Sequence, residues 1–440
     1  MKKVAMVSLG CSKNLVDAEE MLGLIENKGF EIVEDEEDAD VIIVNTCAFI
    51  DSAKRESIDC ILEMAEYKKK DPHKALIVTG CMAQRYKDEV LKELPEIDAV
   101  VGTNDFTRIA EIIEEIENND KKVFCSDSLC PSVPLPRVVT TPPYTAFLKI
   151  AEGCDNRCTY CVIPYIRGAY RSRKMEDILK EAEKLAKAGV KELIVIAQDT
   201  TRYGMDLYKK QKLPRLLKKL AQIDGIHWIR VHYCYPELIS DELIDTIAGE
   251  DKICNYMDIP IQHCNDFILK KMGRRTNKAQ ITGLIKKLRE RIPDVVIRTS
   301  LIAGFPGETK AQADELLEFV SEMNFDRLGV FTYSREEETP AAKLDRQIDE
   351  EEKLKRQEAI MIEQAAVSEE LNREKIGSVY EVLTEGYDAV IKMYYGRSYA
   401  DSAEVDTKIF FKSDTKVSAG EFVNVLIDEA LEYDLFGVKI

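Results

Sequence analysis

The stretch AEGCDNRCTYCVIPYIRG, residues 151–168, holds three cysteines within eight positions, Cys154, Cys158 and Cys161. It follows the β-like run TAFLKI and opens a long region in which such runs alternate with helical patterns. That alternation predicts a parallel sheet with helices against its faces, and about six repeats over residues 140–372 predict an incomplete or complete β/α barrel. The active site of such a barrel lies at the carboxyl ends of its strands, where the three cysteines stand.

Polar residues and glycines follow other candidate strands of this region. Gln198 and Asp199 follow ELIVIA, Gln262 and His263 follow YMDIPI, and the run GFPGET, residues 304–309, follows VVIRTSLIA. The remaining candidate strands are WIRVHY (228–233) and RLGVFTY (327–333). In a barrel these polar groups would face the site, and glycine would let the backbone approach a ligand closely. Each is also compatible with a solvated loop, and Glu308 with a plain β-to-α turn that caps the next helix.

Residues 1–122 show a second alternation of strands and helices. The runs VAMVSL, VIIVNT and ALIVTG are the candidate strands, and Cys11, Cys47 and Cys81 stand at their ends. Parallel strands end at one edge of their sheet, which is where ligands bind in open α/β sheets. These three cysteines, about 35 residues apart in sequence, are therefore predicted to meet in space. Buried cysteine packing after a strand is the alternative for each of them.

Two further segments complete an α/β multidomain chain. Residues 123–139 are proline-rich, with Pro131, Pro134 and Pro136, and are predicted to be a linker. Residues 373–440 lose helical periodicity and gain Val, Tyr, Phe and punctuating Gly, which predicts a small antiparallel β-barrel.

Composition narrows the class of protein. The chain has 440 residues, 45% of them apolar and 32% charged, and no apolar run long enough for a membrane helix. The short run after Lys3 is too brief for a secretory leader, so we expect a cytoplasmic protein whose 12 cysteines are not disulfides. The formal net charge of −18 disfavours diffuse attraction to nucleic acid and suits a basic partner.

The spacing C-x3-C-x2-C offers three thiolates on one tight loop. Structural zinc prefers four protein ligands, commonly in separated pairs, and a [4Fe–4S] cluster normally takes four cysteines. Three cysteines leave one iron of such a cluster open to bind something else. Zinc remains the weaker alternative.

With Tyr160 before the last cysteine, this loop resembles that of the radical S-adenosylmethionine (SAM) superfamily. The signatures GCSKNLVDAE, NTCAFIDSAKRES, VTGCMAQR, EGCDNRCTYC and GFPGET jointly resemble the methylthiotransferase family over essentially the whole chain. The resemblance implies an amino-terminal cluster domain, a radical SAM barrel and a carboxy-terminal TRAM-like barrel. It implies two [4Fe–4S] clusters, one that cleaves SAM to a radical and one that delivers sulfur, while a second SAM supplies the methyl group.

The resemblance also implies the site residues. The cluster ligands would be Cys11, Cys47, Cys81, Cys154, Cys158 and Cys161, and residues near SAM would include Tyr160, Gln198, Gln262, Gly304 and Glu308. The other six cysteines are not expected to ligate. Among them Cys60 lies on an apolar helical face and is expected in the core, and Cys125 with Cys130 could form an adventitious metal pair.

The runs WIRVHYCYPE and GRSYADSAEVD resemble the branch of this family that methylthiolates the β-carbon of an aspartate in ribosomal protein uS12. The tail from Lys375 agrees, since its seven basic residues face twelve acidic ones. Ala18 and Ser402–Ala403 depart from the usual pattern. A transfer-RNA adenosine methylthiotransferase and an iron–sulfur electron carrier without radical chemistry are the alternatives, and an electron donor is an implied further partner.

Overall fold

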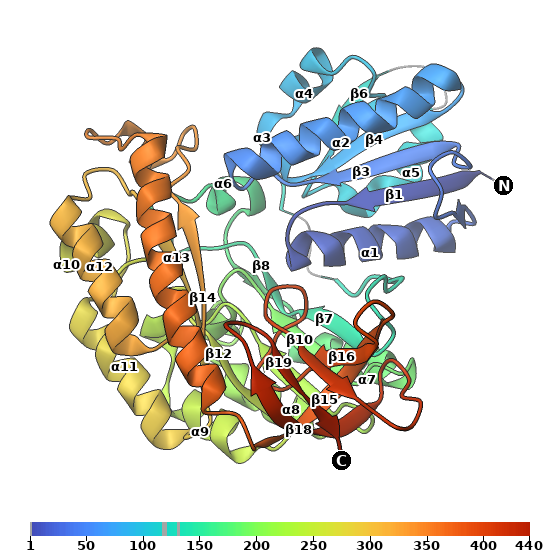
Figure 1. Cartoon of the computed structure of the whole chain (residues 1–440). Coiled ribbons are helices and arrows are strands. Elements are labelled where there is room, and N and C mark those ends of the chain that lie inside the picture. The colour runs from blue at the N-terminus through green and yellow to red at the C-terminus, as the bar shows by residue number, and fades with distance from the viewer. Residues whose placement is uncertain (1, 117–120, 130–132) are drawn as a thin grey trace.

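The computed structural model describes residues 2–116, 121–129 and 133–440. Its elements form two parallel α/β units and a closed β-barrel, coloured blue, green to orange, and red along the chain (Figure 1). Among the described residues, no helix has the length and apolarity to cross a membrane.

The first unit is a six-stranded, all-parallel sheet in the order β2-β1-β3-β4-β5-β6. Every residue of its central strand β3 is buried, the mark of a parallel strand covered on both faces. Val123 and Phe124, predicted to lie in the linker, instead form the edge strand β6, because backbone pairing to β5 decides their conformation. The strands are β1 (Lys3–Ser8), β2 (Glu31–Ile32), β3 (Val41–Thr46), β4 (Ala75–Gly80), β5 (Ala99–Gly102) and β6 (Lys122–Phe124).

Helices cover both faces of this sheet. Apolar residues of α1 and α5 share one core with one face, and residues of α2, α3 and α4 share a second core with the other. The helices are α1 (Ser12–Asn27), α2 (Asp51–Lys70), α3 (Cys81–Tyr86), α4 (Asp88–Glu93) and α5 (Ile109–Glu115).

The second unit is an open parallel sheet whose six main strands stand in chain order, β7-β10-β11-β12-β13-β14. It is therefore the incomplete form of the predicted barrel. The strands are β7 (Thr145–Lys149), β10 (Glu192–Ile196), β11 (Trp228–Val231), β12 (Ile253–Asp258), β13 (Val296–Ala303) and β14 (Arg327–Thr332). A short antiparallel pair, β8 (Ala151–Glu152) and β9 (Arg171–Ser172), flanks the cysteine loop.

Most helices of this unit pack against the outer face of the sheet and form its largest core, whereas Ile166 of α6 packs in a core of the first unit. Side-chain caps fix where several of them begin: Thr309 and Gln312 form a capping box at α12, and Asp349 caps α13. The helices are α6 (Ile163–Arg167), α7 (Met175–Lys187), α8 (Leu213–Ala221), α9 (Asp241–Gly249), α10 (Asp266–Lys271), α11 (Lys278–Arg291), α12 (Lys310–Met323) and α13 (Glu350–Arg373).

The tail forms a closed five-stranded barrel in the order β15-β16-β17-β19-β18. Four of its pairings are antiparallel, and β17 pairs with β19 in parallel. The strands are β15 (Val379–Asp388), β16 (Met393–Arg397), β17 (Ile409–Lys412), β18 (Phe422–Ala430) and β19 (Leu435–Lys439).

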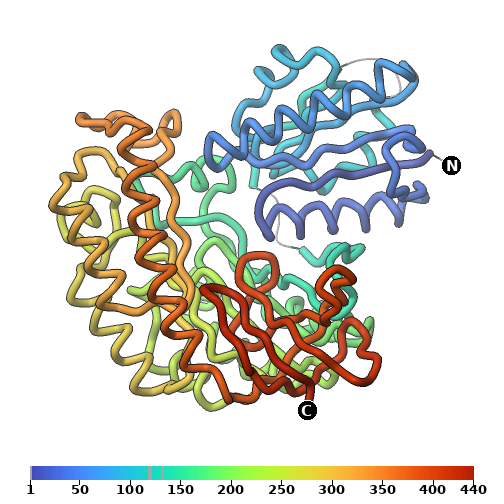
Figure 2. Tube along the Cα trace, in the orientation of Figure 1, coloured from blue at the N-terminus to red at the C-terminus, as the bar shows by residue number. Residues whose placement is uncertain are grey.

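The inner face of the open sheet is covered by the other two units. Phe147, Ile194 and Ile196 pack with Val16 of α1, and Ala403 from the tail joins the same cluster. In Figure 2 the blue trace of α1 lies above the red trace of the tail, next to the green trace that contains the first strands of the open sheet. The inner face of the open sheet is therefore buried by the first unit and by the tail.

Candidate metal centres

The cysteines of the first unit stand together at one edge of its sheet. Cys47 directly follows β3, Cys81 directly follows β4 and begins α3, and Cys11 precedes the first residue of α1. Gly10, with φ of +88°, lies so close to the β3 end that an added Cβ would stand 3.0 Å from Cys47 Sγ. The three strand ends converge as predicted, because parallel pairing brings the ends of β1, β3 and β4 to one edge of the sheet.

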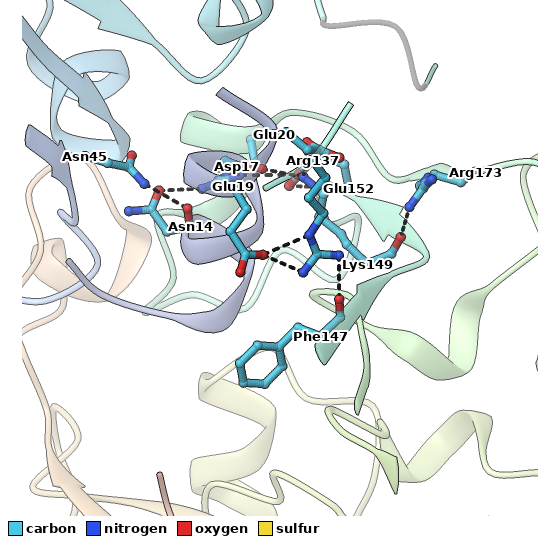
Figure 3. Close-up of polar contacts among 12 residues, drawn as sticks. Asn14, Asp17, Glu19, Glu20, Asn45, Arg137, Phe147, Lys149, Glu152 and Arg173 are labelled. Carbon is cyan, nitrogen blue, oxygen red and sulfur yellow. Dashed lines mark hydrogen bonds and ion pairs between the residues drawn. The ribbon is translucent and has the colours of Figure 1, made fainter. Parts of the chain in front are cut away.

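Buried amides hold these strand ends in place. Asn14 Nδ2 donates to the carbonyl oxygens of Leu9 (2.7 Å) and Thr46 (3.3 Å), which precede Cys11 and Cys47. Asn45 Nδ2 donates back to the Asn14 carbonyl at 2.8 Å (Figure 3). Ser57 of α2 both accepts from the backbone N–H of Cys47 and donates to its carbonyl. These hydrogen bonds hold the loops that carry the thiols.

Burial sets the acid–base character of this triplet. Cys47 and Cys81 are buried, whereas Cys11 is exposed. Burial raises the pKa of the Cys81 thiol to about 12 against the attraction of Arg167, and burial also raises the pKa of Cys47. Such thiols become thiolates when a cation binds them, because a coordinated thiol is deprotonated outright. The donor set is sulfur alone, which suits iron–sulfur chemistry.

The second triplet lies on the loop between β8 and α6, at the carboxyl end of the open sheet. Cys154 and Cys158 are buried, and burial raises the pKa of Cys154 to about 11. The Cys154 N–H donates to the carbonyl of Gly168 (3.1 Å), and the Cys161 N–H donates to that of Cys158 (3.1 Å). The predicted position after the first strand of the barrel is confirmed.

Contacts from the end of α10 and from the residues after β10 hold this loop in place. Thr159 donates from its N–H to Met272 O (2.9 Å) and from Oγ1 to Lys271 O (2.8 Å), at the end of α10. Asp199 accepts from Asn156 Nδ2 at 2.8 Å. Asp199, predicted to face the site, therefore acts as an anchor for the cysteine loop, and its carboxylate is already occupied.

Within the described residues, no three Cys, His, Asp or Glu side chains are close enough to share a single metal ion. Thiolates that ligate different iron atoms of a cluster lie farther apart than ligands of one ion. Two sets of three convergent thiols therefore fit a cluster better than zinc, which prefers four protein ligands.

Tyr160 and Gln198 lie beside the second triplet. Burial, together with the nearby Cys158, raises the pKa of the Tyr160 hydroxyl well above 10. Gln198 donates from Nε2 to Glu152 Oε1 at 2.6 Å, whereas its buried Oε1 has no protein partner among the described residues. A free buried acceptor this close to the cysteine loop is a group that a ligand can satisfy.

Gln262 and His263 follow β12 at the same end of the sheet. Gln262, with φ of +71°, bridges to β13 through its backbone, since it donates to Ser300 O and accepts from Ile302 N–H. His263 Nδ1 accepts from the N–H groups of Cys264 (3.0 Å) and Asn265 (2.9 Å), so the ring proton resides on Nε2. Nε2 is buried without a partner in the described chain and stands 3.6 Å from Glu308 Oε1.

Glu308 closes its own turn. Its Oε2 accepts from the N–H groups of Gly304 (2.5 Å) and Phe305 (3.0 Å), while Thr309 rather than Glu308 caps the following helix. Its buried Oε1 has no hydrogen bond within the described residues. At Gly304 an added Cβ would lie 2.3 Å from Lys353 Cγ of α13. Two features of the fold therefore favour glycine here, the φ of +76° and the neighbouring Lys353 side chain, and its predicted approach to a ligand stays a prediction.

A buried ionic cluster between the first two units was missed by sequence reasoning. Lys149 of β7 pairs with Asp17 and Glu20 of α1 and with Glu152 (Figure 3). Arg167, at the end of α6, pairs with Asp17 and Glu152. Although burial raises the pKa of Glu152, attraction to Arg167 and Lys149 lowers it to about 2. The only sequence signal was a set of charged residues inside otherwise apolar runs. The sequence does not show that these residues pair with one another, because the pairs form between the two units.

Arg274, which follows α10, was also missed. Its guanidinium stacks over the Tyr235 ring with 4.5 Å from Cζ to the centroid, and Nη1 stands 4.0 Å from Cys158 Sγ. It places a buried cation beside the second triplet.

The remaining described cysteines have packing environments. Cys60 of α2 packs partly buried against the first unit's core, as predicted, and Cys125 donates to Ala83 O at 3.4 Å. Cys234, Cys254 and Cys264 are buried. Cys130, the other half of the suggested adventitious pair, and Pro131 of the linker lie outside the described residues.

Three family models match the chain. They are the uncharacterized protein family UPF0004 over residues 3–102, the radical SAM superfamily over residues 148–320 and the TRAM domain over residues 376–440. A Clostridioides difficile (strain 630) protein described as ribosomal protein uS12 methylthiotransferase RimO is 54% identical over 99% of this chain and 98% of its own length. The chain belongs to the RimO family of radical SAM methylthiotransferases. A RimO-family protein of Lachnoclostridium phytofermentans is 53% identical, with 99% of both chains covered.

The fold of this RimO-family chain is shared by more distant proteins. A radical SAM methyltransferase, TsrM from Kitasatospora setae, solved with cobalamin and a [4Fe–4S] cluster, superposes with a TM-score of 0.59 at 14% identity, over 86% of this chain and 80% of that one. A cobalamin-dependent SAM radical enzyme, OxsB, superposes with a TM-score of 0.53 over 82% of this chain and 56% of that one. These likenesses confirm the parallel α/β architecture of the first two units.

Proposed function

We propose that this protein methylthiolates the β-carbon of an aspartate in ribosomal protein uS12. The observation that carries the proposal is near full-length identity above 50% to proteins named for that reaction. The acidic tail supports the same substrate, because seven basic against twelve acidic residues would repel RNA and attract a basic ribosomal protein. The transfer-RNA alternative is therefore not favoured. A plain electron carrier would not need the free polar groups that the strand ends bury beside the cysteine loop.

We propose that Cys154, Cys158 and Cys161 hold one [4Fe–4S] cluster and that Cys11, Cys47 and Cys81 hold a second. When bound, the first supplies the electron that cleaves SAM and the second supplies the sulfur that is inserted. The chain's own share is to position them: Asn14 and Asn45 fix the first set of loops, and Thr159 and Asp199 fix the second.

SAM itself is proposed to lie at the carboxyl end of the open sheet, near Tyr160, Gln198, Gln262, Gly304 and Glu308. Three buried polar atoms there have no hydrogen-bond partner among the described residues: Gln198 Oε1, and His263 Nε2 and Glu308 Oε1, which stand 3.6 Å apart. The nucleoside and amino-acid groups of SAM can hydrogen-bond to such atoms, and the burial of these atoms keeps water from competing. We propose that the enzyme works in the cytoplasm, where its substrate is made, and takes electrons from a separate donor protein.

The decisive experiment is mass spectrometry of cells with and without the gene. Protein uS12 and the transfer-RNA nucleosides are examined for a methylthio group in place of hydrogen. We expect the mark on the uS12 aspartate to vanish while the nucleosides stay unchanged. Loss of a methylthio-adenosine instead would assign the same chemistry to the other substrate.

A further inference from the structure

One side chain joins the two cysteine sites. Arg167 is the last residue of α6, a five-residue helix that begins two residues after Cys161. Its side chain is 3% exposed, and Nη2 donates to Cys81 Sγ at 3.4 Å and to Asn14 Oδ1 at 3.1 Å. A residue on the loop of one triplet therefore hydrogen-bonds a thiol of the other.

The backbone that carries Arg167 is held by the first unit. Val162 and Ile166 pack inside the core formed by α2, α3 and β4. The Ile166 carbonyl accepts from Thr103 Oγ1 at 2.9 Å. Although α6 belongs to the second unit in sequence, its residues pack against and hydrogen-bond to the first unit. These contacts hold the Arg167 guanidinium next to Cys81.

The guanidinium is also oriented by carboxylates. Nη1 pairs with Asp17 of α1 and Glu152 of β8, and this leaves Nη2 free to point at Asn14 and Cys81. Arginine always carries its charge, and its planar guanidinium has several N–H donors in fixed directions. It can therefore pair with carboxylates through one nitrogen while it donates to a sulfur through another.

We propose that Arg167 is a positioning residue that raises the reduction potential of the cluster held by the amino-terminal cysteines. Reduction adds negative charge to a cluster and to its sulfur ligands, and hydrogen bonds to those sulfurs stabilise the more negative state. A cation donating at low dielectric does so more strongly than a neutral amide. The inference rests on the proposed function only in taking Cys81 as a ligand of that cluster.

A competing account is that Arg167 merely balances buried carboxylates. Lys149 provides the matched control, because its ammonium group pairs with the same Asp17 and Glu152, and it is equally buried. Its remaining carboxylate partner is Glu20, in place of the thiol and amide that Arg167 contacts. Loss of either cation perturbs the same ionic cluster, and only loss of Arg167 removes the hydrogen bond to sulfur.

The experiment isolates the amino-terminal cluster in the full chain carrying Cys154→Ala, Cys158→Ala and Cys161→Ala, reconstituted with iron and sulfide. Its reduction is followed by EPR during a potentiometric titration, alone and with Arg167→Lys, Arg167→Gln or Lys149→Gln added. We expect both Arg167 variants to shift the reduction equilibrium about tenfold or more toward the oxidised cluster, about 59 mV for one electron. Arg167→Lys keeps the charge, so a shift there reports the lost hydrogen bond, and Lys149→Gln is expected to shift less.

The outcomes separate the two claims. If the triple variant binds no cluster, the proposed ligands fail and this inference falls with them. If the cluster forms and its potential is the same with Arg167→Lys, or Lys149→Gln shifts it equally, the proposal is overturned while the function stands. A second measurement needs no substitution at Arg167: with ¹⁵N-arginine incorporated, pulsed EPR of the reduced cluster should detect a weakly coupled ¹⁵N nucleus. A spectrum without it overturns the proposal even if the Arg167 variants do not fold.

Discussion

Cys81 and Cys60 show how neighbours decide what a thiol can do. Both have a raised pKa because burial disfavours the thiolate, about 12 for Cys81 and about 11 for Cys60. Around Cys81 stand two further cysteines and a cation, whereas the charged neighbours of Cys60 are glutamates. A cysteine must be a thiolate to bind a metal, and these glutamates repel the thiolate form of Cys60. Cys60 therefore serves packing.

The contrast between a proposed cluster ligand and a packing cysteine predicts different results for substitutions of Cys47 and Cys60. In Cys47→Ala, we expect reductive SAM cleavage to survive, since the second triplet is untouched, while methylthiolation of uS12 falls below detection. The readouts are 5′-deoxyadenosine by chromatography and the modified peptide by mass spectrometry. Cys60→Ala is the control and should retain both. Equal loss of SAM cleavage in Cys47→Ala would contradict the proposed division of labour.

Ser402 departs from the family's usual pattern and has a structural partner. Its Oγ lies 2.8 Å from His232 Nε2, and both residues are buried where the tail meets the open sheet. Burial lowers the pKa of His232 to about 3, so the ring is neutral at physiological pH. A neutral ring and a hydroxyl form a satisfied pair, which explains a polar residue at this buried position.

We therefore expect Ser402→Ala to destabilise the protein by about 1–3 kcal/mol, the cost of leaving a buried polar partner unsatisfied. The free energy of unfolding is measured by urea denaturation at pH 7. Ser413→Ala, at an exposed turn, should change it by less than about 0.5 kcal/mol. An unchanged midpoint in Ser402→Ala would mean that water replaces the hydroxyl at no cost.

At the scale of elements, α12 begins immediately after the turn that holds Glu308. Its first turn is closed by a capping box in which Thr309 Oγ1 accepts from the Gln312 N–H (3.3 Å) and Gln312 Oε1 accepts from the Thr309 N–H (2.9 Å). The box fixes the residue at which helix replaces loop, and so fixes where the Glu308 carboxylate points.

Thr309→Ala should cost about 0.5–2 kcal/mol, as other losses of a helix N-cap do. Hydrogen–deuterium exchange should quicken in the first turn of α12, residues 310–313, and leave α11 unaffected. Thr309→Ser keeps the accepting oxygen and should restore the slow exchange. If exchange in Thr309→Ala stayed at the parent rate, the cap would contribute nothing to the position of the Glu308 turn.

The sequence predicted individual elements well where the pattern is local. Strands β3 and β4 have the predicted bounds, because continuous apolar runs end there at a polar or glycine residue. Strand β12 begins at Ile253, three residues before the prediction, since Cys254 and Asn255 interrupt the apolar run. Edge strand β6 was missed because its pairing with β5 is a tertiary effect on a segment that looks like linker.

At the scale of the whole molecule, the sequence could predict which residues meet within one sheet, but it could not predict which residues meet between units. The three strand-end cysteines of the first unit follow from parallel register alone. Arg167, Lys149 and Asp17 meet only because α1 docks on the open sheet. Gly304 shows the same limit, since the contact that a side chain at this position would make with Lys353 of α13 is not visible in the sequence.

Several buried carboxylates join the tail barrel to the open sheet, among them Asp401, which pairs with Arg327 of β14, and Glu192. Glu192 of β10 is fully buried, accepts from Arg230 Nε at 3.0 Å and pairs with Arg397 Nη2 of β16 at 2.7 Å. Burial alone would raise the pKa of Glu192, but attraction to Arg397 and Arg230 outweighs it and lowers the value to about 2. The ionised form is therefore the one that the docked tail requires.

That pKa gives the docked tail a defined dependence on pH. A carboxyl with a depressed pKa in the folded state stabilises fully above its ordinary value of 4.5, and this stabilisation is lost as pH falls toward 2. For Glu192 the loss is about 2 kcal/mol at pH 3. In Glu192→Gln we expect lower stability at pH 7, by about 3–5 kcal/mol, because two buried guanidinium groups lose the carboxylate that they share.

The gap in unfolding free energy between parent and Glu192→Gln should therefore be constant from pH 7 to 5 and narrow by about 2 kcal/mol at pH 3. Urea midpoints at pH 7, 5, 4 and 3 measure it. Glu381→Gln is the matched control, because Glu381 also bridges tail and sheet, through His227 at 2.8 Å, but is 44% exposed, so that its gap should stay small at every pH. A Glu192 gap that stayed the same down to pH 3 would mean that this carboxyl does not titrate in the acid range, and would contradict the depressed pKa on which the prediction rests.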